Sequence, residues 1–155
     1  MAVQSVTLGK VENLSNLERA NGWTHKWTIA YTDINTASST DNDDVNVILG
    51  NTPANWILSR AALHVTTAFA GATTSSIPTA SFGTDGDVDN FIAASDTTAQ
   101  ATYIGAAGGA PATAAGSHAT AADVLLAQFL FDASSDPAEL TAGSLDIYAA
   151  IHELA

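Results

Sequence analysis

The sequence predicts an all-β protein: an antiparallel β-sandwich of seven to nine strands, with a jelly roll as the expected arrangement. Apolar and polar residues alternate with a period of two over residues 23–31, 57–69 and 145–151, which is typical of strands with one buried face. Turn signals, rather than crossover helices, separate these segments.

The longest alternating stretch, Ile57–Phe69, predicts one long strand around which the other elements are organised. Thr79–Thr84, which follows a proline, predicts a short strand. The sequence Asp-Gly-Asp at positions 85–87 predicts a tight turn, since glycine allows a positive φ and aspartate caps backbone amides. We interpret Val88–Ala94 as a single helical turn at the end of the sheet.

The N-terminal part of the chain predicts a first strand at Val3–Val11, followed by a helical turn or loop at Glu12–Asn21. An Asn-Gly pair at positions 21 and 22 then signals a turn. Trp23–Tyr31 is the most aromatic strand, and we expect it to lie at the centre of a sheet. We therefore divide the chain into an N-terminal segment, residues 1–22, and a β-sandwich domain, residues 23–155.

The remaining segments are assigned by the same criteria. We expect polar or small-residue loops at Asn35–Asp44 and Gly105–Thr120. Further strands are expected at Val45–Leu49, Ser95–Tyr103, Asp123–Phe131 and Gly143–Leu154.

The alternation also predicts which side chains form the core. These are Trp27, Ile29, Leu63, Val65, Phe69, Phe82, Phe91, Val124, Leu126, Phe129, Leu145, Ile147 and Ile151.

Composition limits the partners. Sixteen acidic residues face four basic ones, which gives a net charge of −12 at pH 7. Phosphate binding needs clustered lysine and arginine, so we expect no nucleic acid and no anionic membrane as partner. The chain has no cysteine, which excludes disulfides and thiolate chemistry. Neither a signal peptide nor a membrane span is indicated, and we expect a soluble protein.

One acidic turn resembles the start of a calcium loop, with Asp85, Asp87 and Asp89 as candidate ligands and Asp96 at the twelfth position. An EF-hand needs glycine at the sixth position, where this chain has Asn90. We favour an aspartate-rich turn that caps the following segment, with a surface calcium ion as the alternative.

Other titratable groups give weaker signals. We interpret a second acidic group as a solvated loop: Asp41, Asp43 and Asp44. The four histidines show no metal-ligand spacing, so no zinc site is predicted: His25, His64, His118 and His152. No nucleophile elbow, phosphate loop or dinucleotide fingerprint is present. We therefore predict no catalytic residue and no cofactor, and expect that the protein is not an enzyme.

Several segments together resemble a known family. They are VTTAFAG at 65–71, ASFGTDGDVDNFIAASD at 80–96, the following glycine-rich loop, and AGSLDIYAAIHEL at 142–154. Their order is similar to that of the capsid decoration, or cement, proteins of tailed bacteriophages. The resemblance implies a non-enzymatic jelly roll that sits as a homotrimer on the outer capsid surface of the virion. It also implies assembly in the host cytoplasm and binding to the major capsid protein, with Met1–Gly22 as the capsid-anchoring arm.

Two other functions stay open. A carbohydrate-binding module on the same fold would use Trp23, Trp27 or Trp56 as a stacking platform, and would leave at least two of these rings exposed and coplanar. A decoration protein would bury them. A phage tail or fibre component would share the fold. For the decoration protein we expect trimer contacts through sheet edges and Gly105–Thr120.

Overall fold

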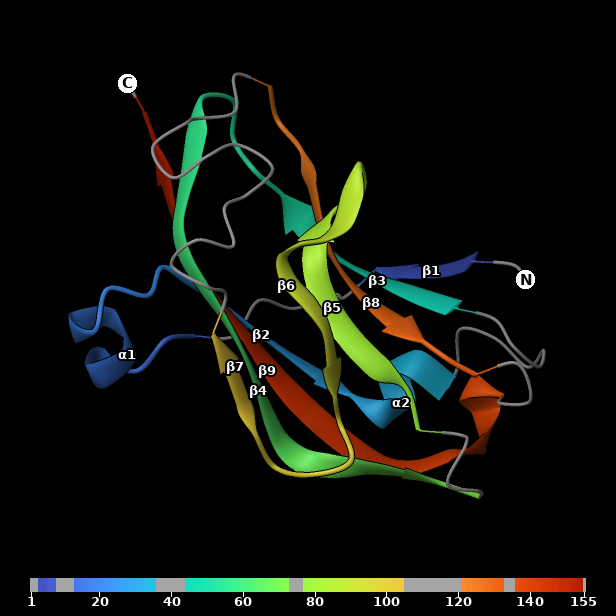
Figure 1. Ribbon diagram of the computed structural model, residues 1–155. Helices are drawn as coiled ribbons and strands as arrows, with labels where there is room; N and C mark the ends of the chain where they lie inside the picture. The colour runs from blue at the N-terminus through green and yellow to red at the C-terminus, as the bar shows by residue number, and fades with distance from the viewer. Residues whose placement is uncertain are drawn as a thin grey trace.

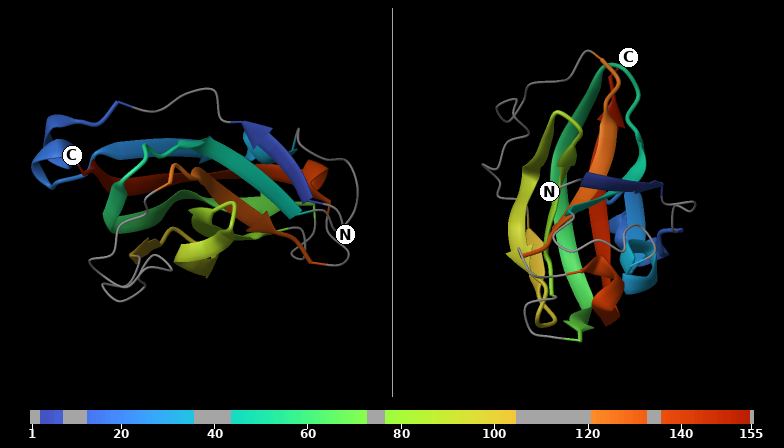
Figure 2. Two further views of the ribbon diagram at one scale, coloured as in Figure 1. Left: turned by 90° about the horizontal axis from the view of Figure 1, so that it is seen from above. Right: turned by 90° about the vertical axis from the view of Figure 1, so that its right-hand side faces the viewer.

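The computed structural model describes residues 3–7, 13–35, 44–72, 77–104, 121–132 and 136–154, which form two β-sheets lying face to face (Figure 1, Figure 2). One sheet has the strand order β1-β3-β8-β5-β6 and the other β2-β9-β4-β7. The first contains β1 (Val3–Thr7), β3 (Asp44–Asn51), β8 (Val124–Leu130), β5 (Thr79–Thr84) and β6 (Asp87–Asp96). The second contains β2 (His25–Ala30), β9 (Leu140–Glu153), β4 (Trp56–Gly71) and β7 (Thr102–Ile104).

The strand pairing is that of a jelly roll. β2 pairs with β9, β3 with β8, β4 with β7 and β5 with β6, all antiparallel. The run β2 to β5 therefore lies against the run β6 to β9, like one long hairpin rolled into two four-stranded sheets. The predicted all-β antiparallel sandwich is confirmed. The described residues depart from an antiparallel jelly roll in one respect: β1 pairs parallel to β3 and so extends one of the two sheets.

Within the described ranges, three short helical segments accompany the sheets: α1 (Asn16–Ala20), α2 (Tyr31–Asn35) and η2 (Pro137–Glu139). The segment Glu12–Asn21, expected as a helical turn or a loop, contains helix α1. A capping box between Ser15 and Glu18 stabilises the start of this helix. Of the helices in the described ranges, none has the length and apolar character needed to cross a membrane.

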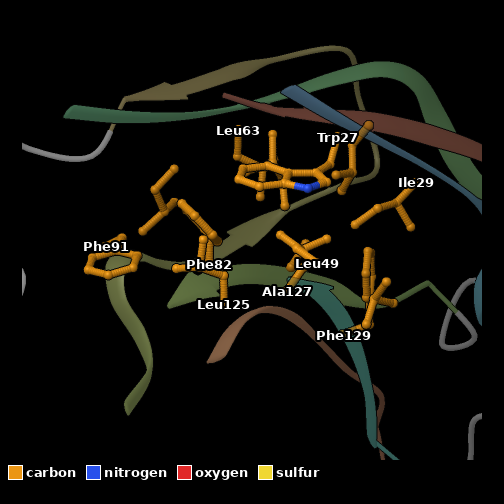
Figure 3. Close-up of a cluster of buried hydrophobic side chains, with 14 of the residues drawn as sticks. Trp27, Ile29, Leu49, Leu63, Phe82, Phe91, Leu125, Ala127 and Phe129 are labelled. Carbon is orange, nitrogen blue, oxygen red and sulfur yellow. The ribbon is translucent and has the colours of Figure 1, made fainter. Parts of the chain in front are cut away.

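The core lies between the two sheets (Figure 3). Its aromatic rings are in contact, with centroid distances of 5.1 Å between Phe82 and Phe91 and 6.2 Å between Trp27 and Phe82. Of the predicted core residues, only Val124 is not buried. Leu126 is buried but lies outside the main cluster, because Leu125 and Ala127 on β8 point into it instead. β8 is almost continuously apolar, so its sequence carries no alternation that would identify the inner face.

The interpretation of Val88–Ala94 as a helical turn was wrong. These residues belong to β6, which pairs antiparallel with β5. The register shifts between Ala80 and Phe82, and this irregularity accompanies the burial of two consecutive residues, Phe91 and Ile92. A bulge breaks the period of two, so the sequence lost its strand signal at that point.

The aromatic strand expected at the centre of a sheet lies at an edge. β2 is the outermost strand of its sheet among the described strands, and it is shorter than predicted. Tyr31 begins α2 instead of ending the strand. The Asp33 carboxylate accepts a hydrogen bond from the Ala30 N–H at 2.8 Å, which stabilises the start of this turn.

The long strand was predicted correctly, but part of its inner face was not. The register of β4 against β9 shifts between Leu58 and Arg60. Trp56 and Leu58 are therefore buried before the shift, and Ala61 and Leu63 after it, while Ile57 is only half-buried. One extra residue in a strand exchanges its two faces, so an uninterrupted alternation assigned Ile57 to the wrong side.

The other expected strands are present with different limits. The segment expected as a strand at Ser95–Tyr103 is divided: its first two residues end β6, and its last two begin the three-residue β7. The last strand begins three residues before the predicted Gly143. The loop expected at Gly105–Thr120 and most of the loop expected at Asn35–Asp44 lie outside the described residues.

Candidate functional site

The acidic turn connects β5 and β6. Its three candidate calcium ligands take part in two separate contacts, one between Asp87 and Asp89 and one between Asp85 and Asp123. Asp89 lies in hydrogen-bond contact with Asp87, and this contact raises its pKa. Burial raises the pKa of Asp123, which directly precedes β8, and a hydrogen bond with Asp85 raises it further. A shared proton relieves the repulsion between two close carboxylates, which explains why each of these contacts raises a pKa.

No cation site with three carboxylate or histidine ligands is formed in the described part of the chain. Asp96, at the twelfth position of the calcium-like pattern, lies at the opposite end of β6 from the turn. Its carboxylate accepts hydrogen bonds from the Thr98 N–H and hydroxyl at 2.8 and 2.9 Å, and the bond from the backbone lowers its pKa. Asp85, Asp87 and Asp89 thus lack the twelfth-position partner that the pattern suggested.

The second acidic group is only partly described. Asp41 and Asp43 lie outside the described residues, whereas Asp44 is the first residue of β3 and is buried. Its carboxylate accepts a hydrogen bond from the Phe131 N–H at 3.3 Å, across the β3–β8 end of the sheet. Asp44 was expected in a solvated loop, and that interpretation was wrong for this residue.

The three described histidines lie apart. His64 of β4 hydrogen-bonds Thr102 at 2.7 Å, and His152 of β9 lies 3.4 Å from the Ser59 hydroxyl. His25 of β2 is half-buried and stacks on Trp27 with a centroid distance of 5.5 Å, and burial lowers its pKa. His118 lies outside the described residues.

Two of the three tryptophans belong to the core. Trp27 is 2% exposed and Trp56 is 4% exposed. Trp23 is half-buried beneath the Arg60 guanidinium, whose Cζ lies 4.1 Å from the ring centroid, and beside Tyr148. The three rings therefore do not form the pair of exposed, coplanar platforms that carbohydrate stacking requires.

An ionic cluster attaches α1 to the outer face of the β2-β9-β4-β7 sheet. Lys26 Nζ lies 3.1 Å from Glu18 Oε1 and 3.3 Å from Asp146 Oδ2. The Tyr148 hydroxyl donates to Glu18 Oε1 at 2.9 Å, and the Thr28 hydroxyl donates to Asp146 Oδ1 at 2.6 Å. One amine thus connects the helix, β2 and β9.

Electrostatics within this cluster reinforce the attachment. A hydrogen bond from the Ser15 N–H, together with those of Tyr148 and Lys26, lowers the pKa of Glu18 to about 2. Burial works against the charged form of Lys26, but hydrogen bonding with Tyr148 and Glu18 and the charge of Asp146 raise its pKa overall. Glu18 and Lys26 are therefore both charged at neutral pH.

Sequence reasoning missed this cluster, although one signal for it was available. Ser15-Asn-Leu-Glu18 is a capping-box pattern and predicts the start of α1. The contact of Lys26 with Asp146 depends on the register that pairs Lys26 with Tyr148 and Thr28 with Asp146 across β2 and β9. Nothing local in the sequence fixes that register.

The clearest candidates for assembly contacts are the sheet edges and the exposed apolar side chains. No described strand pairs with the outer side of β1, β6, β2 or β7. Large exposed apolar residues in the described ranges are Leu17 (71% exposed) on α1, Ile104 (72%) at the end of β7, and Leu154 (42%). Unpaired strand edges are sites where another chain can add a strand.

Comparisons with known proteins found no matching protein-family model, no similar curated protein and no similar solved structure.

Proposed function

We propose that this chain is a non-enzymatic structural protein of a tailed-bacteriophage virion, which binds the major capsid protein and stabilises the outer capsid surface. The jelly roll supports the proposal, because viral capsid proteins are one class built on this arrangement. Lectins and cupins share it, so the fold supports the proposal by analogy only. The burial of Trp27 and Trp56 favours it over the carbohydrate-binding alternative.

The position of β1 carries the proposal. This strand hydrogen-bonds β3 on one side, and no described strand covers its other side. Residues 1–22 contain two acidic and two basic residues, so they are neutral in a chain whose net charge is −12. A strand of the capsid protein can add to this edge with less long-range repulsion than elsewhere on the molecule. The anchoring segment thus acts as the edge of the sandwich rather than as a free arm.

The location is tested by labelling. An antibody against the chain should decorate the outer capsid shell of the particle that the same genome encodes, as seen by electron microscopy. Label on the tail or fibres would favour the tail-component alternative, and absence of label from the particle would refute a virion function.

The β1 edge is tested with two proline variants, Ser5→Pro and Val6→Pro. Successive amides in a strand point in opposite directions, so one of these N–H groups faces β3 and the other faces the free edge. The variant at the free edge should lose co-sedimentation with capsids and keep the wild-type melting temperature. The variant facing β3 should lower the melting temperature. Wild-type capsid binding by both variants would show that the β1 edge is not the contact.

The same proposal includes a homotrimer. Ile104, the exposed last residue of β7, directly precedes the glycine- and alanine-rich stretch 105–120 in the sequence. Small residues allow close approach of two backbones, and an exposed isoleucine supplies apolar area to bury. We place the contacts between protomers along the β7 edge and this stretch.

A further inference from the structure

Three of the four basic residues of the chain lie on one face of the molecule, formed by the outer side of the β2-β9-β4-β7 sheet and the helix beside it. Lys26 is on β2, Arg60 on β4 and Arg19 on α1. Figure 1 shows α1 beside this sheet and apart from the other one. The chain as a whole has a net charge of −12, so this face repels an acidic partner less than an average part of the surface does.

Two of these cations and two aromatic rings alternate in one stack on this face. Lys26 Nζ lies 5.2 Å from the centroid of the Tyr148 ring, and the centroids of Tyr148 and Trp23 are 5.5 Å apart. Arg60 Cζ lies 4.1 Å from the Trp23 centroid at the other end. A Cβ atom at Gly22 would come 3.2 Å from Arg60 Nη2, so the guanidinium also lies close to the backbone of that turn. These contacts hold the guanidinium in one orientation.

The two ends of the stack differ in the anions that they contact. At one end, Lys26 Nζ forms ion pairs with the carboxylates of Glu18 and Asp146, at 3.1 and 3.3 Å. At the other end, no carboxylate of the described residues pairs with Arg60, and no described residue accepts a hydrogen bond from its guanidinium. Arg60 is exposed, so its planar set of N–H donors faces solvent. A guanidinium presented in this way matches the two oxygens of a carboxylate.

We propose that Arg60 and Trp23 form a docking surface for an acidic segment of a partner protein. A glutamate or aspartate carboxylate of that segment accepts two parallel hydrogen bonds from the Arg60 guanidinium, and the half-buried Trp23 supplies apolar area beside it. Arginine, tryptophan and tyrosine are the residues that most often carry the binding energy of protein interfaces. Nucleic acids and anionic membranes need larger clusters of bases than this face has. The surface lies on the sheet that does not contain β1, and it does not depend on the proposed role in the capsid.

The test follows the Arg60 Nε–H and the Trp23 indole N–H in ¹⁵N-edited NMR spectra. The probe is the peptide acetyl-Glu-Glu-Leu-Glu-Glu-amide, and its neutral counterpart has glutamine in place of each glutamate. The acidic peptide should shift both signals in a saturable manner, with a dissociation constant on the order of 1 mM at low salt. The neutral peptide should leave them in place, and the buried indoles of Trp27 and Trp56 should not respond to either. No shift with the acidic peptide would refute the docking surface.

Two variants separate the Arg60 contact from general attraction between charges. Arg60→Lys keeps the charge and removes the planar pair of donors, so it should weaken binding of the acidic peptide about tenfold, measured on the Trp23 signal. Arg19→Gln is the matched control, because Arg19 is also exposed and has no ion-pair partner among the described residues. It removes a full charge but should weaken binding only about twofold. Unchanged affinity in Arg60→Lys, or equal losses in the two variants, would overturn the proposal.

Two further measurements test the nature of the partner. Inorganic phosphate should shift the Arg60 signal less than the acidic peptide does at the same concentration, and an equal shift would show a general oxyanion contact only. Sedimentation velocity should give the same self-association for Arg60→Lys as for the wild type. Weaker self-association of this variant would place the carboxylate on a second copy of this chain and would refute a separate partner protein.

Discussion

Gly143 of β9 lies directly against the ring of Phe69 of β4. A Cβ atom at position 143 would come 2.8 Å from Phe69 Cε1 and closer still to Cγ and Cδ1. Gly143 also has a φ of 137°, a conformation that residues with a side chain rarely adopt. The contact lies where the register of β4 and β9 is irregular, around Thr67 and Ala70. The two strands can approach here only because position 143 has no side chain.

Gly143→Ala should therefore lower the free energy of unfolding by about 1–3 kcal/mol, since Phe69 must shift within a packed core. Gly50→Ala is the matched control. Gly50 has a φ of 150°, but a Cβ there would meet no atom within 4 Å, so only the conformational cost applies. Chemical denaturation measures both. Equal losses would show that the contact with Phe69 adds nothing.

The two faces of the long strand make a second prediction. Leu63 is fully buried, whereas Ile57 is half-buried beyond the register shift. Leu63→Ala should lower the free energy of unfolding by about 2–5 kcal/mol. Ile57→Ala should cost clearly less, because less apolar surface is lost from contact. A larger loss for Ile57→Ala would place the bulge elsewhere in β4.

The fold class was predictable because a period of two survives along most of β4 and β9, and turn residues separate the strands. The errors cluster where that period fails. The bulge near Ser59 exchanged the faces of β4, and the irregular pairing with β5 concealed β6. Whether a strand lies at the edge or the centre of a sheet depends on long-range pairing. The aromatic content of β2 therefore did not predict its position at the edge.

The site residues were less predictable than the strands. Asp85 and Asp123 are 38 positions apart, and the pairing of β5 with β8 brings them together. The cleft between the two sheets, which Trp27, Leu49, Leu125 and Ile151 line, likewise combines residues from β2, β3, β8 and β9. Local patterns identify residue types that suit a turn or a strand, but only the register of the sheets places distant side chains side by side.

A third prediction concerns the ionic cluster and acid pH. The pKa of Glu18 is about 2 in the folded protein, against an ordinary value of 4.5. Its ionised form therefore adds stability above pH 4.5, and this contribution disappears as the pH falls toward 2. Glu18→Gln should destabilise the protein at neutral pH by about 1 kcal/mol or less, because the pair is partly exposed.

The difference in unfolding free energy between wild type and Glu18→Gln should accordingly shrink between pH 4.5 and pH 2. Denaturation series at several pH values measure it, with Asn16→Asp as a variant that adds a charge to the same helix without touching Lys26. A difference that stays constant with pH would show that Glu18 acts through packing alone.

A fourth prediction uses two aspartates of β6 with opposite shifts. Contact with Asp87 raises the pKa of Asp89 above its ordinary 3.8. The protonated form of Asp89 therefore stabilises the fold at low pH, and this contribution is lost as the pH rises through the raised pKa. The Thr98 N–H lowers the pKa of Asp96, whose contribution is present above 3.8 and lost as the pH falls. At pH 7, Asp89→Asn should raise the melting temperature and Asp96→Asn should lower it. Shifts of the same sign would contradict this assignment.

The last prediction concerns self-association. Copies with a net charge of −12 repel one another, and salt screens this repulsion, with a Debye length of about 10 Å at about 0.1 M. If apolar and backbone contacts at the β7 edge hold the trimer together, raising the salt from low to moderate should strengthen association, as measured by sedimentation velocity. Ile104→Ser should weaken it at every salt concentration. Leu17→Ser is the matched control, because Leu17 is as exposed as Ile104 but lies on α1. Equal effects of the two variants would move the contact away from β7. A monomer under all conditions would refute a trimer in free solution and restrict assembly to the capsid surface.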